Sequence, residues 1–131
     1  MIAKQVSVFL ENRQGRLGEV LSVLKENKVN IQSISLADTT EYGLLRLIVD
    51  EPERAKEKLV EAGFSTMIAD VLIVKIPHSP GSLQTILQTI AEQAINVEYM
   101  YGLTVAGDEA SIVVKTSDLA RACEVFKGCK A

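Results

Sequence analysis

Hydrophobic and polar residues alternate near the start of the chain. Val6, Val8 and Leu10 occupy every second position, a period that predicts a strand with one buried face. Between positions 17 and 24 the spacing of the apolar residues changes to three and four, which predicts one buried face of a helix. The chain therefore begins with a strand and a helix, joined by a loop that contains Gly15.

The same two periods, together with turn residues, divide the rest of the chain into short elements. Pro52 opens a helix that Gly63 ends, because proline suits the first helical turn and glycine suits the position after the last. Ser117 is expected to cap the last helix. The remaining predicted elements are strands at 30–37, 44–49, 65–69, 71–76, 96–103 and 110–115, and a helix whose apolar face holds Leu83, Ile86, Leu87, Ile90 and Ala94.

The sequence repeats itself once. Shifting the chain by 66 positions places Gly15 on Gly81 and the segment 29–31 on 95–97, and the apolar positions of the first predicted helices coincide. A duplication explains this agreement better than chance does. We therefore predict two units, at 1–70 and 71–131.

The order of the elements predicts the fold class. The first unit has the order βαββαβ and the second has the order βαββα, so the protein is expected to be α+β with two tandem ferredoxin-like units. Each unit would form an antiparallel sheet with helices on one face, and the second unit lacks its last strand. Either that edge of the second sheet stays open, or another strand fills it, for example one from a partner chain.

Composition and charge narrow the classes of partner. The chain of 131 residues has a net charge of −3, which argues against nucleic acid because phosphate binding needs a basic face. No apolar run approaches the roughly 18–20 residues that span a bilayer, and we recognise no signal peptide before the first strand. We therefore expect a cytoplasmic protein with neither a nucleic-acid partner nor a membrane partner.

The two cysteines do not indicate a metal site or another cofactor. Cys123 and Cys129 are six positions apart, a spacing that matches no metal-binding motif. We expect Cys123 to be a buried thiol in the last helix and Cys129 to be an exposed thiol near the end of the chain, both in a reducing compartment. No cofactor, metal ligand or catalytic residue is predicted.

The loop before the first helix carries the most suggestive chemistry. Gly15 lets the backbone turn, and the first amides of the following helix then form a site suited to a carboxylate. Asn12 offers a donor and an acceptor for an ammonium or amide, and Arg13 and Arg16 could meet an anion. The alternative is that Asn12 and Gly15 only shape the turn while both arginines are solvated.

Each unit resembles an ACT domain. The resemblance lies in the loop before the first helix and in the start of the strand that follows this helix. In the first unit the pattern is Asn12-Arg13-Gln14-Gly15-Arg16-Leu17 followed by Asn30-Ile31. In the second unit it is His78-Ser79-Pro80-Gly81-Ser82-Leu83 followed by Asn96-Val97. The resemblance covers nearly the whole chain twice, and it is strongest to the small stand-alone tandem ACT proteins of bacteria. Two prolines and the missing last strand set the second copy apart.

The resemblance implies a regulatory role. ACT domains bind amino acids and regulate enzymes such as phosphoglycerate dehydrogenase, aspartate kinase and prephenate dehydratase, with the ligand between two paired domains. It implies a free amino acid as ligand, a homodimer, and a metabolic enzyme as a further partner rather than a catalytic activity of the chain itself. The implied ligand-binding residues are Asn12, Arg13, Gly15, Arg16, Leu17, Asn30 and Ile31 in the first unit and His78, Ser79, Pro80, Gly81, Leu83, Asn96 and Val97 in the second.

Other functions remain open on the sequence alone. An interaction module with degenerate ligand sites would have the same pattern. An acylphosphatase-like enzyme would use Arg13 and Asn12, but the loop lacks a glycine-rich phosphate cradle. A metal carrier would need paired cysteines in the first loop, and an RNA-binding sheet would need stacked aromatic residues where the chain has only Tyr99 and Tyr101.

Overall fold

The computed structural model describes residues 1–11, 14–38 and 42–126, which fall into two compact units. The N-terminal unit comprises residues 4–69. The C-terminal unit comprises residues 1–3 together with residues from 70 onward. Each unit is described by itself below. The division of the sequence repeat at 1–70 and 71–131 stays a prediction.

The N-terminal unit is a sheet with two helices. Its elements are β1 (Ile2–Glu11), α1 (Arg16–Glu26), β2 (Ile31–Asp38), β3 (Tyr42–Val49), α2 (Pro52–Glu61) and the first part of β4 (Ser65–Pro77). The strand order in this unit is β2-β3-β1-β4, and β3 pairs antiparallel with both β2 and β1. This arrangement confirms the predicted ferredoxin-like α+β fold.

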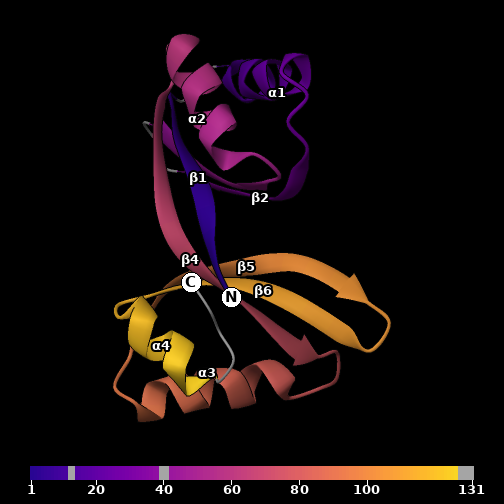
Figure 1. Ribbon diagram of the computed structural model, residues 1–131, viewed down its shortest axis with the longest axis vertical. Coiled ribbons are helices and arrows are strands. Elements are labelled where there is room, and N and C mark those ends of the chain that lie inside the picture. Colours follow the sequence, from indigo (N-terminus) through magenta and orange to yellow (C-terminus); the bar gives the residue numbers. More distant parts are fainter. Residues whose placement is uncertain (12–13, 39–41, 127–131) are drawn as a thin grey trace. The chain divides into compact units, whose positions relative to one another are not determined.

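One apolar core explains why both helices of the N-terminal unit lie on the same face of its sheet. Val6 and Val8 of β1 are fully buried, and they share this core with Val20 of α1 and Leu59 of α2. The alternation along β1 and the three- and four-residue spacing along α1 direct these side chains inward. Figure 1 shows α1 and α2 in the part of the ribbon drawn at the top.

The C-terminal unit repeats the arrangement. Its elements are residues 70–77 of β4, α3 (Ser82–Glu92), β5 (Val97–Ala106), β6 (Glu109–Thr116) and α4 (Leu119–Val125). β6 pairs antiparallel with both β4 and β5, and a second core joins Leu72 of β4, Ile90 of α3 and Ala122 of α4. In Figure 1, α3 and α4 lie on the same side of β5 and β6.

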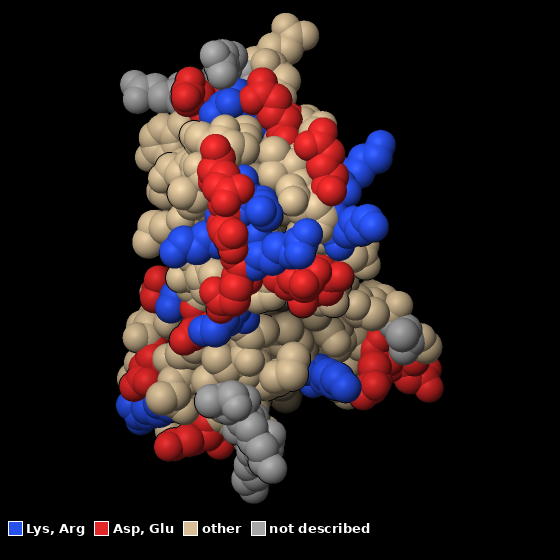
Figure 2. Space-filling view, turned by 45° about the horizontal axis from the view of Figure 1, so that its top comes forward, with Lys and Arg blue, Asp and Glu red and all other residues tan. Residues whose placement is uncertain are grey.

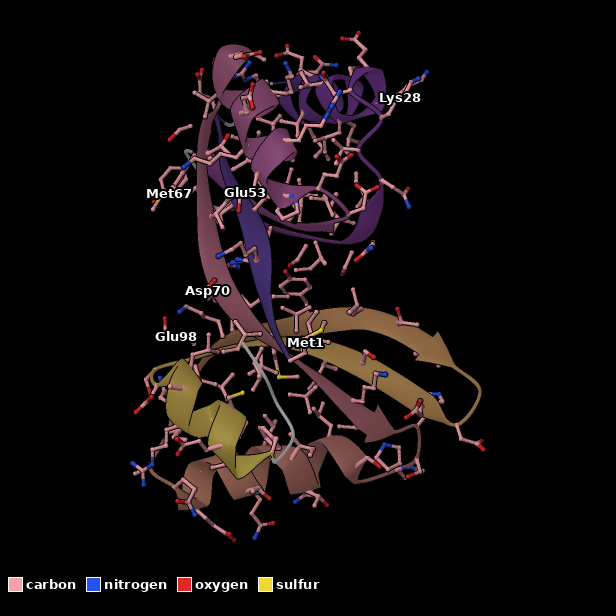
Figure 3. All side chains as sticks on the ribbon, viewed as in Figure 1. Met1, Lys28, Glu53, Met67, Asp70 and Glu98 are labelled. Carbon is pink, nitrogen blue, oxygen red and sulfur yellow. The ribbon has the colours of Figure 1, made fainter. Side chains whose placement is uncertain are left out.

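The missing last strand of the C-terminal unit is supplied by the start of the same chain. The Met1 amino group donates to the Ile73 carbonyl at 3.1 Å, and the Ile73 amide donates to the Met1 carbonyl at 2.8 Å. The neighbouring Ile2 packs against the C-terminal core. Met1 lies beside the strands of this unit (Figure 3), so its sheet has the four-strand order β1-β4-β6-β5.

β4 differs from the expected pair of strands. The sequence predicted one strand up to position 69 and another from position 71, with Asp70 as a junction. The structure instead has a single strand of 13 residues, Ser65–Pro77. Because Asp70 is exposed and no glycine or proline interrupts the strand before Pro77, the backbone can continue without a turn.

Two helices end on residues with left-handed backbone conformation. Lys28 follows α1 and Ala94 follows α3, each with φ 58°. The Lys28 amide donates to the Lys25 carbonyl at 3.1 Å, and the next amide, from Val29, donates to the Leu24 carbonyl at 2.9 Å, which is a Schellman end. Ala94, predicted on the apolar helix face, therefore lies in the turn beyond the helix.

The predicted apolar face of α3 is only partly buried. Ile90 is 1% exposed and Ile86 packs against the core, as predicted. Leu83 is 37% exposed, and together with Leu87 it borders a surface hollow. The face that enters the core is therefore narrower than the apolar residues alone suggest.

On the face drawn in Figure 2, acidic and basic side chains are interspersed rather than gathered by sign. In residues 1–11, 14–38 and 42–126 no helix is long and apolar enough to cross a membrane, and no group of three His, Cys, Asp or Glu side chains is placed to hold a metal ion.

Cys123 is buried, but it is disulfide-bonded rather than the expected thiol, and Cys129 lies outside the described residues.

Candidate functional site

A surface hollow of about 420 Å³ lies in the N-terminal unit where β1 ends and α1 begins. Four parts of the unit border it: the end of β1, the start of α1, the start of β3, and the turn between α2 and β4. The residues that line it are Phe9, Leu10, Glu11, Arg16, Tyr42, Gly63 and Ser65. The hollow therefore sits at the loop that the sequence singled out for ligand binding.

Gly15 sets the direction in which α1 leaves this loop. It is the N-cap residue, with φ 87° and ψ −8°, a left-handed conformation that side-chain-bearing residues rarely adopt. The Glu19 amide donates to the Gly15 carbonyl at 3.0 Å and closes the first helical turn. A Cβ at Gly15 would meet no atom within 4 Å, so the requirement for glycine comes from the backbone conformation rather than from crowding.

Arg16, the first residue of α1, is held by two side chains. Its guanidinium carbon lies 4.2 Å from the centroid of the Phe64 ring, a cation–π contact. Its Nη1 donates to Glu19 Oε2 at 2.6 Å. The side chain is only 13% exposed, whereas arginines at a helix start are usually solvated, so this guanidinium is fixed in place at the wall of the hollow.

Arg16 retains hydrogen-bonding capacity. Its Nη2 lies 4.0 Å from Glu11 Oε1, an ion-pair distance that is too long for a hydrogen bond. Its Nε is buried and has no hydrogen-bond partner among the described residues. Because Nε is buried, the donor that remains for a carboxylate in the hollow is Nη2.

Two aromatic side chains form an apolar wall that sequence reasoning missed. The rings of Phe9 and Tyr42 have centroids 6.0 Å apart at an angle of 53°, and their exposed fractions are 42% and 46%. Phe9 alternates out of phase with the buried residues of β1, which was a signal available in the sequence. Tyr42 joins it only through the register of β1 with β3, where Glu11 stands opposite Tyr42.

The other residues predicted for the first unit are placed differently. Leu17 packs against the core of the unit. Asn12 and Arg13 lie outside the described residues. Asn30 and Ile31 lie at the opposite end of the sheet, because Ile31 pairs with Val49, seven residues along β3 from Tyr42, or about 24 Å. Within one unit the structure does not bring them to Arg16, and their role in binding stays a prediction.

The second predicted loop has the same backbone and different chemistry. Gly81 is the N-cap residue of α3, with φ 85°, like Gly15 before α1. The Ser79 and Ser82 hydroxyls lie 2.8 Å apart, and the His78 amide donates to the Asp108 carbonyl at 2.6 Å. The side chains of His78 and Pro80 are exposed. This loop is bound to its own unit through hydrogen bonds.

Asn96 and Val97 begin β5 as Asn30 and Ile31 begin β2. The Asn96 amide donates to Ser117 Oγ at 3.0 Å, and the Asn30 amide donates to Asp50 Oδ1 at 3.0 Å. The prediction that Ser117 caps the last helix is therefore wrong. Asp118 caps α4, because its Oδ1 accepts from the Arg121 amide at 3.1 Å.

The charged and aromatic groups of the hollow have no counterparts in the C-terminal unit. A shift of 66 positions places Phe9 on Lys75, Glu11 on Pro77 and Arg16 on Ser82. A hollow of about 700 Å³ in that unit lies instead along the outer face of α3, and its lining is uncharged. It is bordered by Leu83, Gln84, Leu87, Gln88 and Ala91.

The sequence matches the family model described as an ACT domain pair over residues 1–130. The chain belongs to the ACT domain pair family. This confirms the resemblance drawn from the loops and repeated strands. The crystal structure of protein BT0572 from Bacteroides thetaiotaomicron is similar to this ACT domain pair, with 35% identity and a TM-score of 0.92 over 97% of this chain and 88% of that one.

More distant structures share the fold. The ligand-free regulatory subunit of aspartate kinase from Thermus thermophilus has 15% identity and a TM-score of 0.69, covering 100% of this ACT domain pair and 98% of that chain. The corresponding subunit from Thermus flavus has 17% identity and a TM-score of 0.66, with 95% and 91% covered. No curated protein matches the sequence. These two subunits are therefore similar to the ACT domain pair in fold.

Proposed function

We propose that this ACT domain pair is a regulatory protein that binds one free amino acid per chain, in the hollow of the N-terminal unit. The observation that carries the proposal is Arg16, fixed by Phe64 and Glu19 at the wall of the hollow with Nη2 left as a donor for a carboxylate. The start of α1 behind Gly15 adds the positive end of the helix dipole, which favours the same charge.

Regulation without catalysis fits the chemistry of the site. The chain's only histidine, His78, lies in the other unit, and the described residues that line the hollow include neither a histidine nor a cysteine. Binding would shift the protein toward whichever state holds the ligand more tightly, and it would alter a partner enzyme by that difference in affinity. A metabolic enzyme as partner, supported by the fold shared with aspartate kinase regulatory subunits, and the cytoplasmic location belong to this proposal.

A homodimer is part of the same proposal. β2 is the edge strand of the N-terminal unit's sheet, and its Ile34 and Leu36 are 46% and 50% exposed. An exposed apolar edge strand is suited to pairing with the same strand of a second copy. Antiparallel pairing of two β2 strands would place Asn30 and Ile31 of the second copy at the end of the sheet that carries the hollow. Asn30 and Ile31 of one copy would then approach the hollow of the other copy.

A thermal-shift screen of the twenty amino acids at millimolar concentration tests the proposal, because a ligand that binds only the folded state raises the melting temperature. We expect one or a few amino acids to raise it, and isothermal titration with such a ligand to give one site per chain. Arg16→Gln should abolish the rise, while the matched exposed variant Arg54→Gln on α2 should retain it. No rise with any amino acid, or a rise that survives Arg16→Gln, would contradict the proposal.

A further inference from the structure

We infer that the ligand is an amino acid with a large apolar or aromatic side chain, held by Arg16 at its carboxylate, by Glu11 at its ammonium and by the Phe9–Tyr42 wall at its side chain. This inference rests on the proposed function, because it names the chemical class of ligand for the same hollow. It uses three groups that lie around one opening: a cation, an anion and an apolar surface.

The charges at the hollow favour a zwitterion. Arg16 is flanked by Glu19 at 2.6 Å and by Glu11 at 4.0 Å, so these three groups carry a net charge of −1. A simple anion would meet Arg16 but would be repelled by Glu11. An amino acid offers both charges, so that its carboxylate can reach Arg16 Nη2 while its ammonium pairs with Glu11.

Glu11 is suited to the ammonium because it is not committed to Arg16. Its side chain is 71% exposed, and its nearest oxygen is too far from Arg16 Nη2 to accept a hydrogen bond. Glu19, in contrast, already accepts from Arg16 Nη1. The two carboxylates therefore differ in function: Glu19 orients the guanidinium, and Glu11 is left for the ligand.

The aromatic wall gives the preference for a large side chain. Phe9 and Glu11 lie on one face of β1, and the register places Tyr42 opposite Glu11, so both rings flank the position assigned to the ammonium. The two rings are tilted, with centroids 6.0 Å apart, and each of the two residues is more than two-fifths exposed. An apolar side chain in contact with these rings would remove apolar surface from water on both partners. The hollow volume of about 420 Å³ lies within the usual range for small-molecule sites.

Isothermal titration of the full chain tests the assignment. The probes are L-phenylalanine, L-leucine, glycine, L-aspartate and L-lysine, together with 3-phenylpropionate and phenethylamine, which lack the ammonium and the carboxylate respectively. We expect L-phenylalanine or L-leucine to bind at least about tenfold more tightly than the other three amino acids, and both truncated compounds to bind at least about tenfold more weakly than L-phenylalanine.

Variants connect this preference to the named residues. Phe9→Ala should remove most of the preference for the large side chain, whereas Phe9→Leu should keep it. Glu11→Gln should weaken the binding of L-phenylalanine and leave the binding of 3-phenylpropionate unchanged or make it tighter. Met67→Ala removes another exposed apolar side chain, which projects from β4 outside the hollow (Figure 3), and should change nothing.

The outcomes separate this inference from the proposed function. If glycine, aspartate or lysine binds as tightly as the tighter of phenylalanine and leucine, or if 3-phenylpropionate binds as tightly as phenylalanine, the assignment is wrong while amino-acid binding stands. If Phe9→Ala changes the oligomeric state and not the preference, the aromatic wall is an interface between copies and the assignment is also wrong. If no amino acid binds at all, the proposed function itself fails.

Discussion

The guanidinium of Arg16 lies over the ring of Phe64, with its carbon 4.2 Å from the ring centroid. The two residues are 48 positions apart in the sequence, one at the start of α1 and the other directly before β4. Phe64 is 4% exposed and belongs to the core of the N-terminal unit. The position of the candidate ligand-binding cation therefore depends on core packing as well as on its own helix.

Phe64→Leu should weaken both stability and ligand binding. The substitution removes the ring under Arg16 and part of the buried volume, which should lower the unfolding free energy by roughly 1–2 kcal/mol. Urea unfolding measures this loss, and titration with the amino acid found in the screen should show weaker binding. Val60→Ala, at an exposed position of α2, serves as the control. Unchanged binding in a folded Phe64→Leu variant would show that the ring does not position Arg16.

Gly15→Ala and Gly18→Ala should change stability in opposite directions. Gly15 has φ 87°, so an alanine there should cost roughly 1–2 kcal/mol of unfolding free energy. Gly18 lies inside α1 with open space around its Cβ position, so alanine there should stabilise the protein by about 1 kcal/mol. Thermal or urea unfolding measures both. If Gly15→Ala and Gly18→Ala changed the unfolding free energy equally, the loop at Gly15 would have to relax to accept a side chain.

Lys28→Gly should raise stability although it removes a charged side chain. Lys28 projects from the end of α1 (Figure 3) with φ 58°, a conformation that glycine adopts at lower cost. We expect the unfolding free energy, measured by urea unfolding, to rise by about 0.5–1 kcal/mol. The gain is limited because the entropy that glycine adds to the unfolded chain offsets part of the backbone strain that it removes. Lys25→Gly, inside the helix, should instead lower the unfolding free energy by about 1 kcal/mol.

Removal of residues 1–3 should affect the C-terminal unit specifically. The Ile73 amide donates to Met1 and should be protected from hydrogen exchange in the full chain. The shortened chain should lose that protection, and amides elsewhere in β4 and β6 should exchange faster because the sheet has lost its edge strand and Ile2 has left the core. Unchanged protection at Ile73 would show that this strand contributes little in solution.

Ile34→Lys should disrupt the proposed dimer. In a dimer paired through β2, the lysine at this exposed position would lie near the lysine introduced in the second copy, and the two charges would repel each other. Sedimentation velocity should show a shift from dimer to monomer, whereas Val60→Lys, also exposed but on α2, should leave the dimer intact. A monomeric unsubstituted protein, or a dimer that tolerates Ile34→Lys, would contradict pairing through β2.

The sequence predicted the elements of this fold because their signals are local. Val6, Val8 and Leu10 alternate, α1 has its apolar residues on one face, and Gly15 and Gly81 mark equivalent turns, so the duplicated ferredoxin-like pattern could be read directly. The local signals were least reliable at element ends. Ala94 continues the apolar spacing although the chain has already turned, and Ser117 and Asp118 are both good capping residues that only geometry separates.

The candidate site depends on tertiary structure, because its walls come from segments far apart in the chain. The sequence by itself determined Gly15 and Arg16 as candidates, since a strand, a glycine and a helix start are adjacent there. Only the fold decided that Phe64 supports Arg16 and that Tyr42 joins Phe9, since a one-residue change of register would send Tyr42 to the opposite face. The pairing of Met1 with Ile73 is likewise a long-range contact that no local pattern encodes, and it closes the edge that the sequence left open.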